Sequence, residues 1–239
     1  MEHIDKILNQ LVEKLQDAHG KRIRSVILYG SGATGEVHGT HSDLNVLCVL
    51  EGVTVRDLGA AESVFQWWRD KGNPAPLLLS SDEIRTSADC FPIEFHDIVD
   101  RHKVLFGDDL THTLKIDDRF YRAQVEHELR AKYLRLRQKA AGVLHNRDLL
   151  LRLMTDSIST FCVLGRHGLR LGGFDAPYTK HAIVASFRDS FAVAGKAFDT
   201  LLGLREGNIK PRDVEPAALF ENYLEEIAAL IAAVDRLEN

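Results

Sequence analysis

Two apolar runs near the N-terminus, Ser25–Tyr29 and Leu44–Leu50, are joined by a glycine-rich segment. Each run is short and bounded by turn-forming residues, which is typical of a buried strand. The segment Gly30–Gly35 follows the first run directly and has the spacing GxGxxG. Only eight residues, 36–43, then precede the second run, and they show no helical apolar pattern. This short connection limits which folds the chain can form.

The glycines permit two familiar interpretations that the spacing argues against. A phosphate-binding P-loop needs Gly-Lys-Ser or Gly-Lys-Thr at its end, and neither follows here. A dinucleotide-binding turn fits the glycines, and Glu51 stands where a ribose-binding acid belongs. However, a crossover between parallel strands needs a dozen or more residues, usually a helix. A dinucleotide-dependent oxidoreductase is therefore the weakest alternative.

A third interpretation fits the short connection. Gly30 and Ser31 form a tight turn into a short helix, and the chain returns through a loop to a strand that begins at Asp43. Backbone N–H groups at the helix start bind phosphate oxygens, and the Ser31 hydroxyl adds a further donor. A carboxylate opposite them can hold Mg²⁺ against the phosphates. This arrangement suits transfer of a phosphoryl or nucleotidyl group.

The remaining pattern divides the chain into two halves. In the first, apolar spacing predicts helices over 4–15 and 58–68, a strand over 76–79, and one or two strands within 93–105. In the second it predicts four antiparallel helices. These helices are expected over residues 125–144, 149–164, 181–204 and 216–237. We therefore expect an α+β fold with domains 1–110 and 111–239, the boundary falling near 107–118.

The strand and turn residues resemble a known family. A strand ending in Leu28-Tyr29-Gly30-Ser31, eleven further residues, and then Asp43-Leu44-Asn45-Val46-Leu47 is similar to the motif of the nucleotidyltransferase superfamily that includes DNA polymerase beta. Among its members, the chain looks most like small bacterial aminoglycoside and lincosamide nucleotidyltransferases. The resemblance implies a small mixed sheet with helices, followed by an all-helical bundle.

The resemblance also implies roles for matched positions. Gly30, Ser31 and Ser42 would bind the triphosphate of an NTP, with ATP preferred, and Asp43 would coordinate Mg²⁺. Glu94, in the segment Pro92-Ile93-Glu94-Phe95, would be a metal ligand or the base that deprotonates an acceptor hydroxyl.

Two choices among charged residues stay open. Asp97 competes with Glu94 as the third acid; strand alternation would place the two on opposite faces, and Glu94 is favoured for its apolar neighbours. From the basic stretch of the second half, Lys132 or Arg130 could reach the triphosphate, although a solvated helix face is the usual explanation for such a stretch.

Asn45 departs from the family pattern, because the second metal carboxylate falls at this position. An amide oxygen can coordinate a hard cation, but it brings no charge. We expect an enzyme that transfers a nucleoside monophosphate to a hydroxyl of a small molecule or protein and releases pyrophosphate. The alternative is a degenerate, regulatory nucleotide-binding protein of an antitoxin-like kind. A hydrogen-bonded amide in the core would also explain Asn45.

Charge and cysteine content limit which partners and which cellular compartment we expect for this chain. The 239 residues carry a net charge of −5, which argues against bulk binding of nucleic acid. Residues 1–110 hold 11 Lys and Arg against 18 Asp and Glu, so the excess negative charge lies in the first half. Three widely spaced cysteines favour no disulfide framework, which fits a reducing cytoplasm. No apolar run is long enough to span a membrane, and a homodimer stays open.

Overall fold

The computed structural model describes residues 2–34 and 44–237. The chain divides into two compact units, Met1–Asp118 and Arg119–Asn239. Within the described ranges, no helix combines the length and apolar character needed to cross a membrane.

Four strands of the described residues form one mixed sheet in the N-terminal unit, in the order β3-β2-β1-β4. They span Ile23–Tyr29 (β1), Asn45–Leu50 (β2), Leu77–Ser80 (β3) and His102–Gly107 (β4). Strand β1 pairs antiparallel with both β2 and β4, whereas β3 pairs parallel with β2. The antiparallel pairing of β1 with β2 is incompatible with the parallel crossover of a dinucleotide-binding fold. Glu51 instead forms an ion pair with Arg24 at 2.9 Å.

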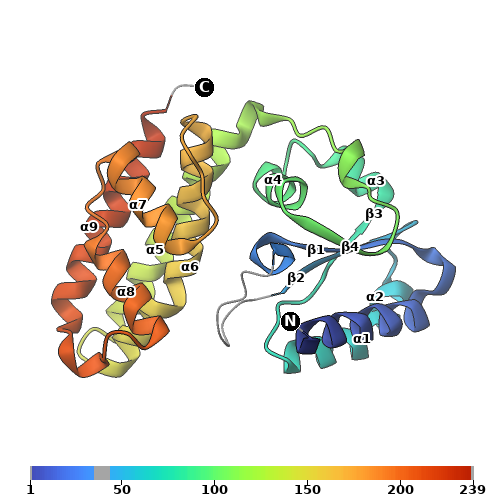
Figure 1. Ribbon diagram of the computed structural model, residues 1–239, viewed down its shortest axis with the longest axis horizontal. Coiled ribbons are helices and arrows are strands. Elements are labelled where there is room, and N and C mark those ends of the chain that lie inside the picture. Colours follow the sequence, from blue (N-terminus) through green and yellow to red (C-terminus); the bar gives the residue numbers. More distant parts are fainter. Residues whose placement is uncertain (1, 35–43, 238–239) are drawn as a thin grey trace. The chain divides into compact units, whose positions relative to one another are not determined.

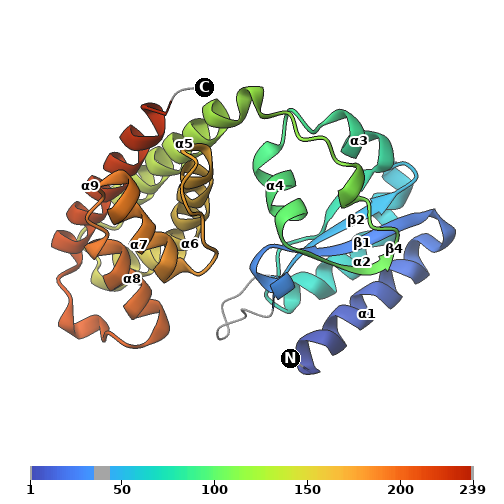
Figure 2. The same ribbon diagram turned by 45° about the horizontal axis from the view of Figure 1, so that its top comes forward.

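Helices cover both faces of the sheet (Figures 1 and 2). On one face lie α1 (Glu2–His19) and α2 (Val55–Asp70), and on the other lie α3 (Ser81–Thr86) and α4 (Pro92–Asp100). This division follows from strand geometry, because successive side chains point to opposite faces. The predicted helices over 4–15 and 58–68 and the strand over 76–79 are confirmed.

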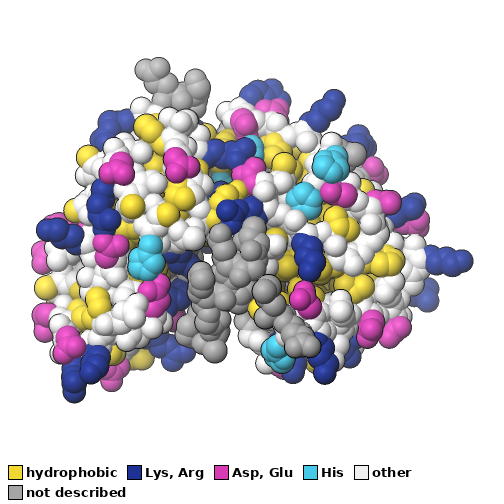
Figure 3. All heavy atoms as spheres, in the orientation of Figure 1, with side chains coloured by type: hydrophobic (Ala, Val, Ile, Leu, Met, Phe, Trp, Pro, Cys, Tyr) yellow, Lys and Arg dark blue, Asp and Glu magenta, His cyan; other side chains and the backbone are white. Residues whose placement is uncertain are grey.

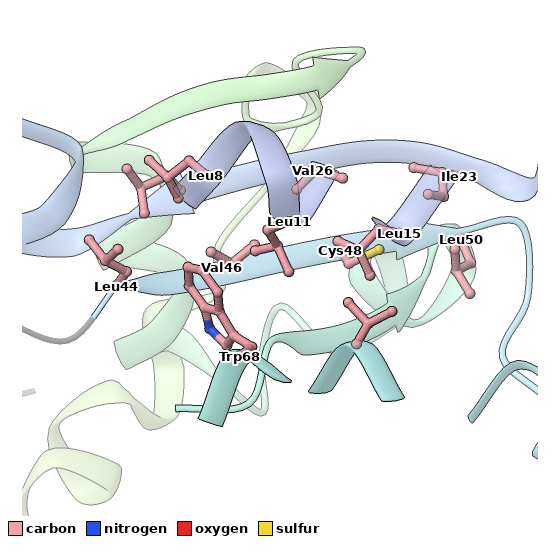
Figure 4. Packing of buried hydrophobic residues seen from close by; sticks show 12 residues of the cluster. Leu8, Leu11, Leu15, Ile23, Val26, Leu44, Val46, Cys48, Leu50 and Trp68 are labelled. Carbon is pink, nitrogen blue, oxygen red and sulfur yellow. The ribbon is translucent and has the colours of Figure 1, made fainter. Parts of the chain in front are cut away.

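The two faces bury separate apolar clusters. Figure 4 shows Leu8, Leu11 and Leu15 of α1 and Trp68 of α2 packed against strand residues that include Val46. The opposite cluster joins alternate strand residues to α3 and α4. Its buried members are Ile27, Leu47, Val49, Ile84, Ala88, Phe95 and Ile98. The central strands are thus apolar on both faces, which explains why they read as continuous apolar runs.

The segment that we expected to begin a strand at Ile93 is helical. Helix α4 begins with Pro92 in its first turn, where proline is tolerated because that N–H has no partner within the helix. Phe95 and Ile98 are both buried, a spacing of three that fits one face of a helix. Strand β4 follows at His102. The expected strand alternation around Glu94 is therefore wrong.

The C-terminal unit is a helical bundle (Figure 1). Its helices are α5 (Tyr121–Ala141), α6 (Arg147–Leu171), α7 (Lys180–Phe191), α8 (Lys196–Glu206) and α9 (Pro216–Asp235). Small residues let helices approach closely: a Cβ on Gly165 of α6 would lie 2.2 Å from the Phe187 ring of α7.

The single helix expected over 181–204 is two helices. The chain turns at Ala192 and Gly195, which both adopt left-handed backbone angles. The start of α8 has no side-chain cap of its own. Its backbone N–H groups donate instead to the buried carboxylate of Glu226 in α9, at 2.7 Å from Lys196, 3.2 Å from Ala197 and 3.3 Å from Phe198. A tertiary contact thus replaces the local start signal that the sequence lacks.

We expect Glu226→Ala to lower the free energy of unfolding by about 2–4 kcal/mol, because three N–H groups at the start of α8, two of them buried, lose a charged acceptor. Glu226→Gln keeps one acceptor oxygen and should lower the free energy of unfolding by less. Urea denaturation followed by circular dichroism measures both effects. Glu225→Gln is the matched control, since Glu225 is the exposed neighbour of Glu226. Equal stability of Glu226→Ala and the wild type would contradict the capping role.

All three cysteines are free thiols, and Cys90 is the exposed one. Burial raises the pKa of Cys48 and of Cys162 to about 12. We expect a thiol reagent to modify one cysteine per native chain, and none in Cys90→Ser. Rapid modification of all three native thiols would contradict the assignment.

The two buried thiols contribute stability that is fully present below pH 9, the pKa of an unfolded thiol. Because the thiols of the unfolded chain ionise first, this contribution should be lost as the pH rises from 9 towards 12. Urea denaturation at several pH values measures the loss.

Candidate functional site

Three strand ends meet at one edge of the N-terminal sheet. Tyr29, the last residue of β1, pairs with Asn45 at the start of β2 and with His102 at the start of β4. The chain then enters a short 3-10 helix, η2 (Gly30–Thr34), as the third interpretation of the glycine segment expects. The Gly30 N–H donates to the Arg101 carbonyl oxygen at 3.0 Å. This bond ties the turn to the junction between α4 and β4.

The turn after β1 requires glycine. Gly30 has a φ of +74°, a backbone conformation that other residues rarely adopt. A Cβ at this position would lie 3.5 Å from Nδ2 of Asn45. The Asn45 amide therefore lies beside the turn, as the motif spacing predicts.

Tyr29 and Asn45 share the sheet face that α4 covers. Tyr29 packs against the cluster that contains Ile27 and Phe95, and Asn45 alternates with the buried Leu47 of the same cluster. Helix α4 also contacts η2 directly. The polar start of β2 thus faces the helix that carries Glu94.

Two carboxylates of α4 act on Tyr29. Burial, and after it the negative charges of Glu94 and Asp97, raise the pKa of Tyr29 to about 12. Glu94 is half-buried, and one of its carboxylate oxygens is shielded from solvent. Residues three apart lie on the same side of a helix, so Glu94 and Asp97 are neighbours rather than on opposite faces. Both acids therefore stay candidates for the third position of the motif.

The structure places Asn45 beside Gly30, and Glu94 lies on α4, which covers the same sheet face. Ser42 and Asp43 lie outside the described residues. Ser31 follows Gly30 in η2. Lys132 belongs to α5 of the other unit, where its Nζ lies 3.4 Å from a carboxylate oxygen of Glu128.

The donor chemistry at this edge suits a hard cation. Asn45 offers an amide oxygen and Glu94 a carboxylate, and oxygen is the donor that Mg²⁺ prefers. Within residues 2–34 and 44–237, no group of three His, Cys, Asp or Glu side chains could hold a metal. Asp43, the acid that the resemblance assigns to Mg²⁺, lies outside the described residues.

The sequence motif did not single out Tyr29 as a site residue. Its signal is positional: it is the last residue of an apolar strand, directly before the glycine turn, and it shares a face with Ile27. Because burial and the two carboxylates raise its pKa, its phenol stays protonated above the pH at which an exposed tyrosine ionises.

The helical unit contains a buried polar cluster that the sequence also did not reveal. The Arg166 guanidinium stacks on the Tyr178 ring at 4.2 Å and lies 3.2 Å from Nε2 of His167. Nδ1 of His167 lies 2.5 Å from the Tyr121 hydroxyl. Because arginine only donates, Nε2 accepts and the proton of neutral His167 is on Nδ1. The cluster fixes this histidine in one tautomer and joins α5 to α6.

No family model matches the sequence, and no curated protein sequence matches it. Similarity appears in the fold, which is that of a nucleotidyltransferase: a small mixed sheet with helices, followed by a helical bundle. The α+β class expected from the sequence is confirmed.

The similarity extends over both units. Spectinomycin adenyltransferase AAD(9) from Enterococcus faecialis, solved with ATP and spectinomycin, aligns with a TM-score of 0.61 and 14% identity, over 97% of this chain and 99% of that chain. A toxin-antitoxin structure with AMP-PNP aligns over 42% of this chain and 74% of its own, with 17% identity. Its TM-score of 0.30 is too low for a comparison of folds.

The proximity of Glu94 to Tyr29 is testable by titration. We expect Glu94→Gln to lower the Tyr29 pKa from about 12, because one of two repelling carboxylates loses its charge. Carbon-13 NMR of ring-labelled tyrosine, assigned with Tyr29→Phe, measures the ionisation. Glu51→Gln is the control, since Glu51 follows the opposite end of β2 and pairs with Arg24. An unchanged Tyr29 titration in Glu94→Gln would show that Glu94 faces elsewhere.

Proposed function

We propose that this chain is a nucleotidyltransferase that transfers a nucleoside monophosphate from Mg-ATP to a hydroxyl group and releases pyrophosphate. The N-terminal domain, residues 1–110, binds the nucleotide, and the helical domain, residues 111–239, holds the acceptor. The acceptor is a small molecule or a protein.

One observation carries the proposal. The glycine turn and Asn45, which are far apart in the motif, lie side by side on the sheet face covered by the helix of Glu94. The fold around them is similar to that of an adenyltransferase solved with ATP. The same edge therefore offers N–H donors for phosphate oxygens and oxygen donors for a cation.

Each matched residue has a part in the transfer. Gly30 shapes the turn, because its own N–H donates to the Arg101 carbonyl oxygen, and the Ser31 N–H together with Ser42 binds phosphate oxygens. Asp43, Asn45 and Glu94 would hold Mg²⁺, which supplies positive charge against the triphosphate.

The acceptor oxygen forms a bond to the α-phosphorus while the bond from that phosphorus to the pyrophosphate oxygen breaks. Glu94 takes the acceptor proton when it acts as the base. Tyr29 keeps its own proton and so cannot compete for that role at neutral pH.

Asn45 supports a second candidate function. With an amide in place of the second carboxylate, the site brings one negative charge fewer to a cation. A protein of this kind could bind a nucleotide and regulate a partner, as an antitoxin-like subunit, without turnover. Binding with no transfer would distinguish this function from the enzyme.

Calorimetry with ATP, with and without Mg²⁺, tests the nucleotide site without an acceptor. We expect binding that strengthens with Mg²⁺ and is lost or greatly weakened in Asp43→Ala. With an acceptor found by screening pyrophosphate release, the same variant should lower turnover about a hundredfold or more, because several kcal/mol of charge stabilisation are lost. Asp82→Ala, an exposed acid of α3, is the control. Unchanged turnover in Asp43→Ala would refute the proposed reaction.

Asn45→Asp separates the two candidate functions. We expect it to lower the Mg²⁺ concentration needed for half-maximal ATP binding several-fold, because it restores a charge at the cation. A gain of turnover in this variant from an inactive wild type would establish the degenerate site. Glu94→Gln and Asp97→Asn, compared at saturating ATP, identify the third acid by which one lowers turnover.

A further inference from the structure

The helical unit contains a cavity of about 200 Å³ between α5 and α6. Three of its lining side chains are basic: Lys132, Arg135 and Lys139. They stand three and four residues apart on α5, so they share one face of that helix. Like charges at this spacing repel one another. The cavity therefore concentrates positive charge.

Two of these cations are not neutralised by the protein. Among the described residues, Arg135 and Lys139 form no ion pair, whereas Lys132 lies near Glu128. The acidic residue of the lining, Asp156, is exposed and pairs with Arg152 at 3.7 Å. Elsewhere on the unit the charges are mixed, and Figure 3 shows Lys and Arg interspersed with Asp and Glu on the visible face. The two uncompensated cations at a cavity differ from this mixed surface.

The rest of the lining is apolar or neutral. Leu136 and Phe161 are buried, and Leu153 is half-buried beside them. Ser157 of the lining is already occupied, because its hydroxyl donates to the Met154 carbonyl oxygen at 2.9 Å. Thr160 has no hydrogen-bond partner among the described residues, so its hydroxyl can donate to a ligand. The cavity thus combines cations, one free donor and an apolar floor.

We propose that this cavity binds a small phosphomonoester with an apolar body. The phosphate contacts Arg135 and Lys139, since a guanidinium matches phosphate oxygens in a bidentate way and a lysine adds a point charge. The apolar body lies on Leu136, Leu153 and Phe161. This site belongs to the helical unit alone, and its occupancy does not depend on nucleotidyl transfer.

Phenyl phosphate is a suitable probe, because its size and its two ends match the cavity. Titration of the full chain at low salt, followed by amide and arginine-side-chain NMR, should show saturable chemical-shift changes for Arg135 and for the amides of residues 153–160. Inorganic phosphate should bind more weakly, since it lacks the apolar body, and benzyl alcohol should not bind. Added salt should weaken the binding. Shifts confined to the turn after β1, or no saturation, would overturn the proposal.

Substitutions test the assigned cations. We expect Arg135→Gln and Lys139→Gln each to weaken phenyl phosphate binding about tenfold, the loss that follows from one charged hydrogen bond. Arg137→Gln is the matched control, because Arg137 lies on the same helix but stacks on Tyr133, 5.6 Å from its ring centre. All three positions are outside the apolar core, so folding can be checked by thermal melting. Equal binding by wild type and Arg135→Gln, or an equal loss in Arg137→Gln, would refute the site.

Discussion

The antiparallel pairing of β1 with strands on both of its edges is the constraint on which the N-terminal unit depends. Because β2 and β4 both run against β1, both begin where β1 ends. The chain leaves β1 through the glycine turn that follows Tyr29. The start of β2, the α4–β4 junction and the turn then meet at one sheet edge. The candidate site is a consequence of this topology.

Asn45 shows how this edge combines structure and chemistry. An amide within an apolar strand needs a polar environment. As the first residue of β2 it has one, beside the Gly30 turn and on the α4 face. In the helical unit, by contrast, the uncompensated charges are positive and line a cavity of their own.

Apolar spacing along the sequence predicted those helices and strands for which it fits only one of the two periods. Strands β1, β2 and β3 and helices α1, α2, α5, α6 and α9 lie where apolar spacing indicates them. For helix α4 the local signals conflict, because Ile93 and Phe95 alternate as in a strand, whereas Ile98 and the proline of the first turn fit a helix. The division of 181–204 was missed because a non-glycine residue, Ala192, takes a left-handed conformation, and a remote carboxylate, Glu226, caps the following helix.

By itself, the sequence determined the class of the fold and the motif that relates Gly30 to Asn45. Both depend on short-range features: strand periodicity, a glycine turn and a connection too short for a crossover helix. Only the tertiary structure decided that Glu94 and Asp97 share a helix beside Tyr29, and that Arg135 and Lys139 line a cavity with Phe161 of another helix. Such relations depend on which surfaces pack together, and residues distant along the chain set that packing through burial and charge.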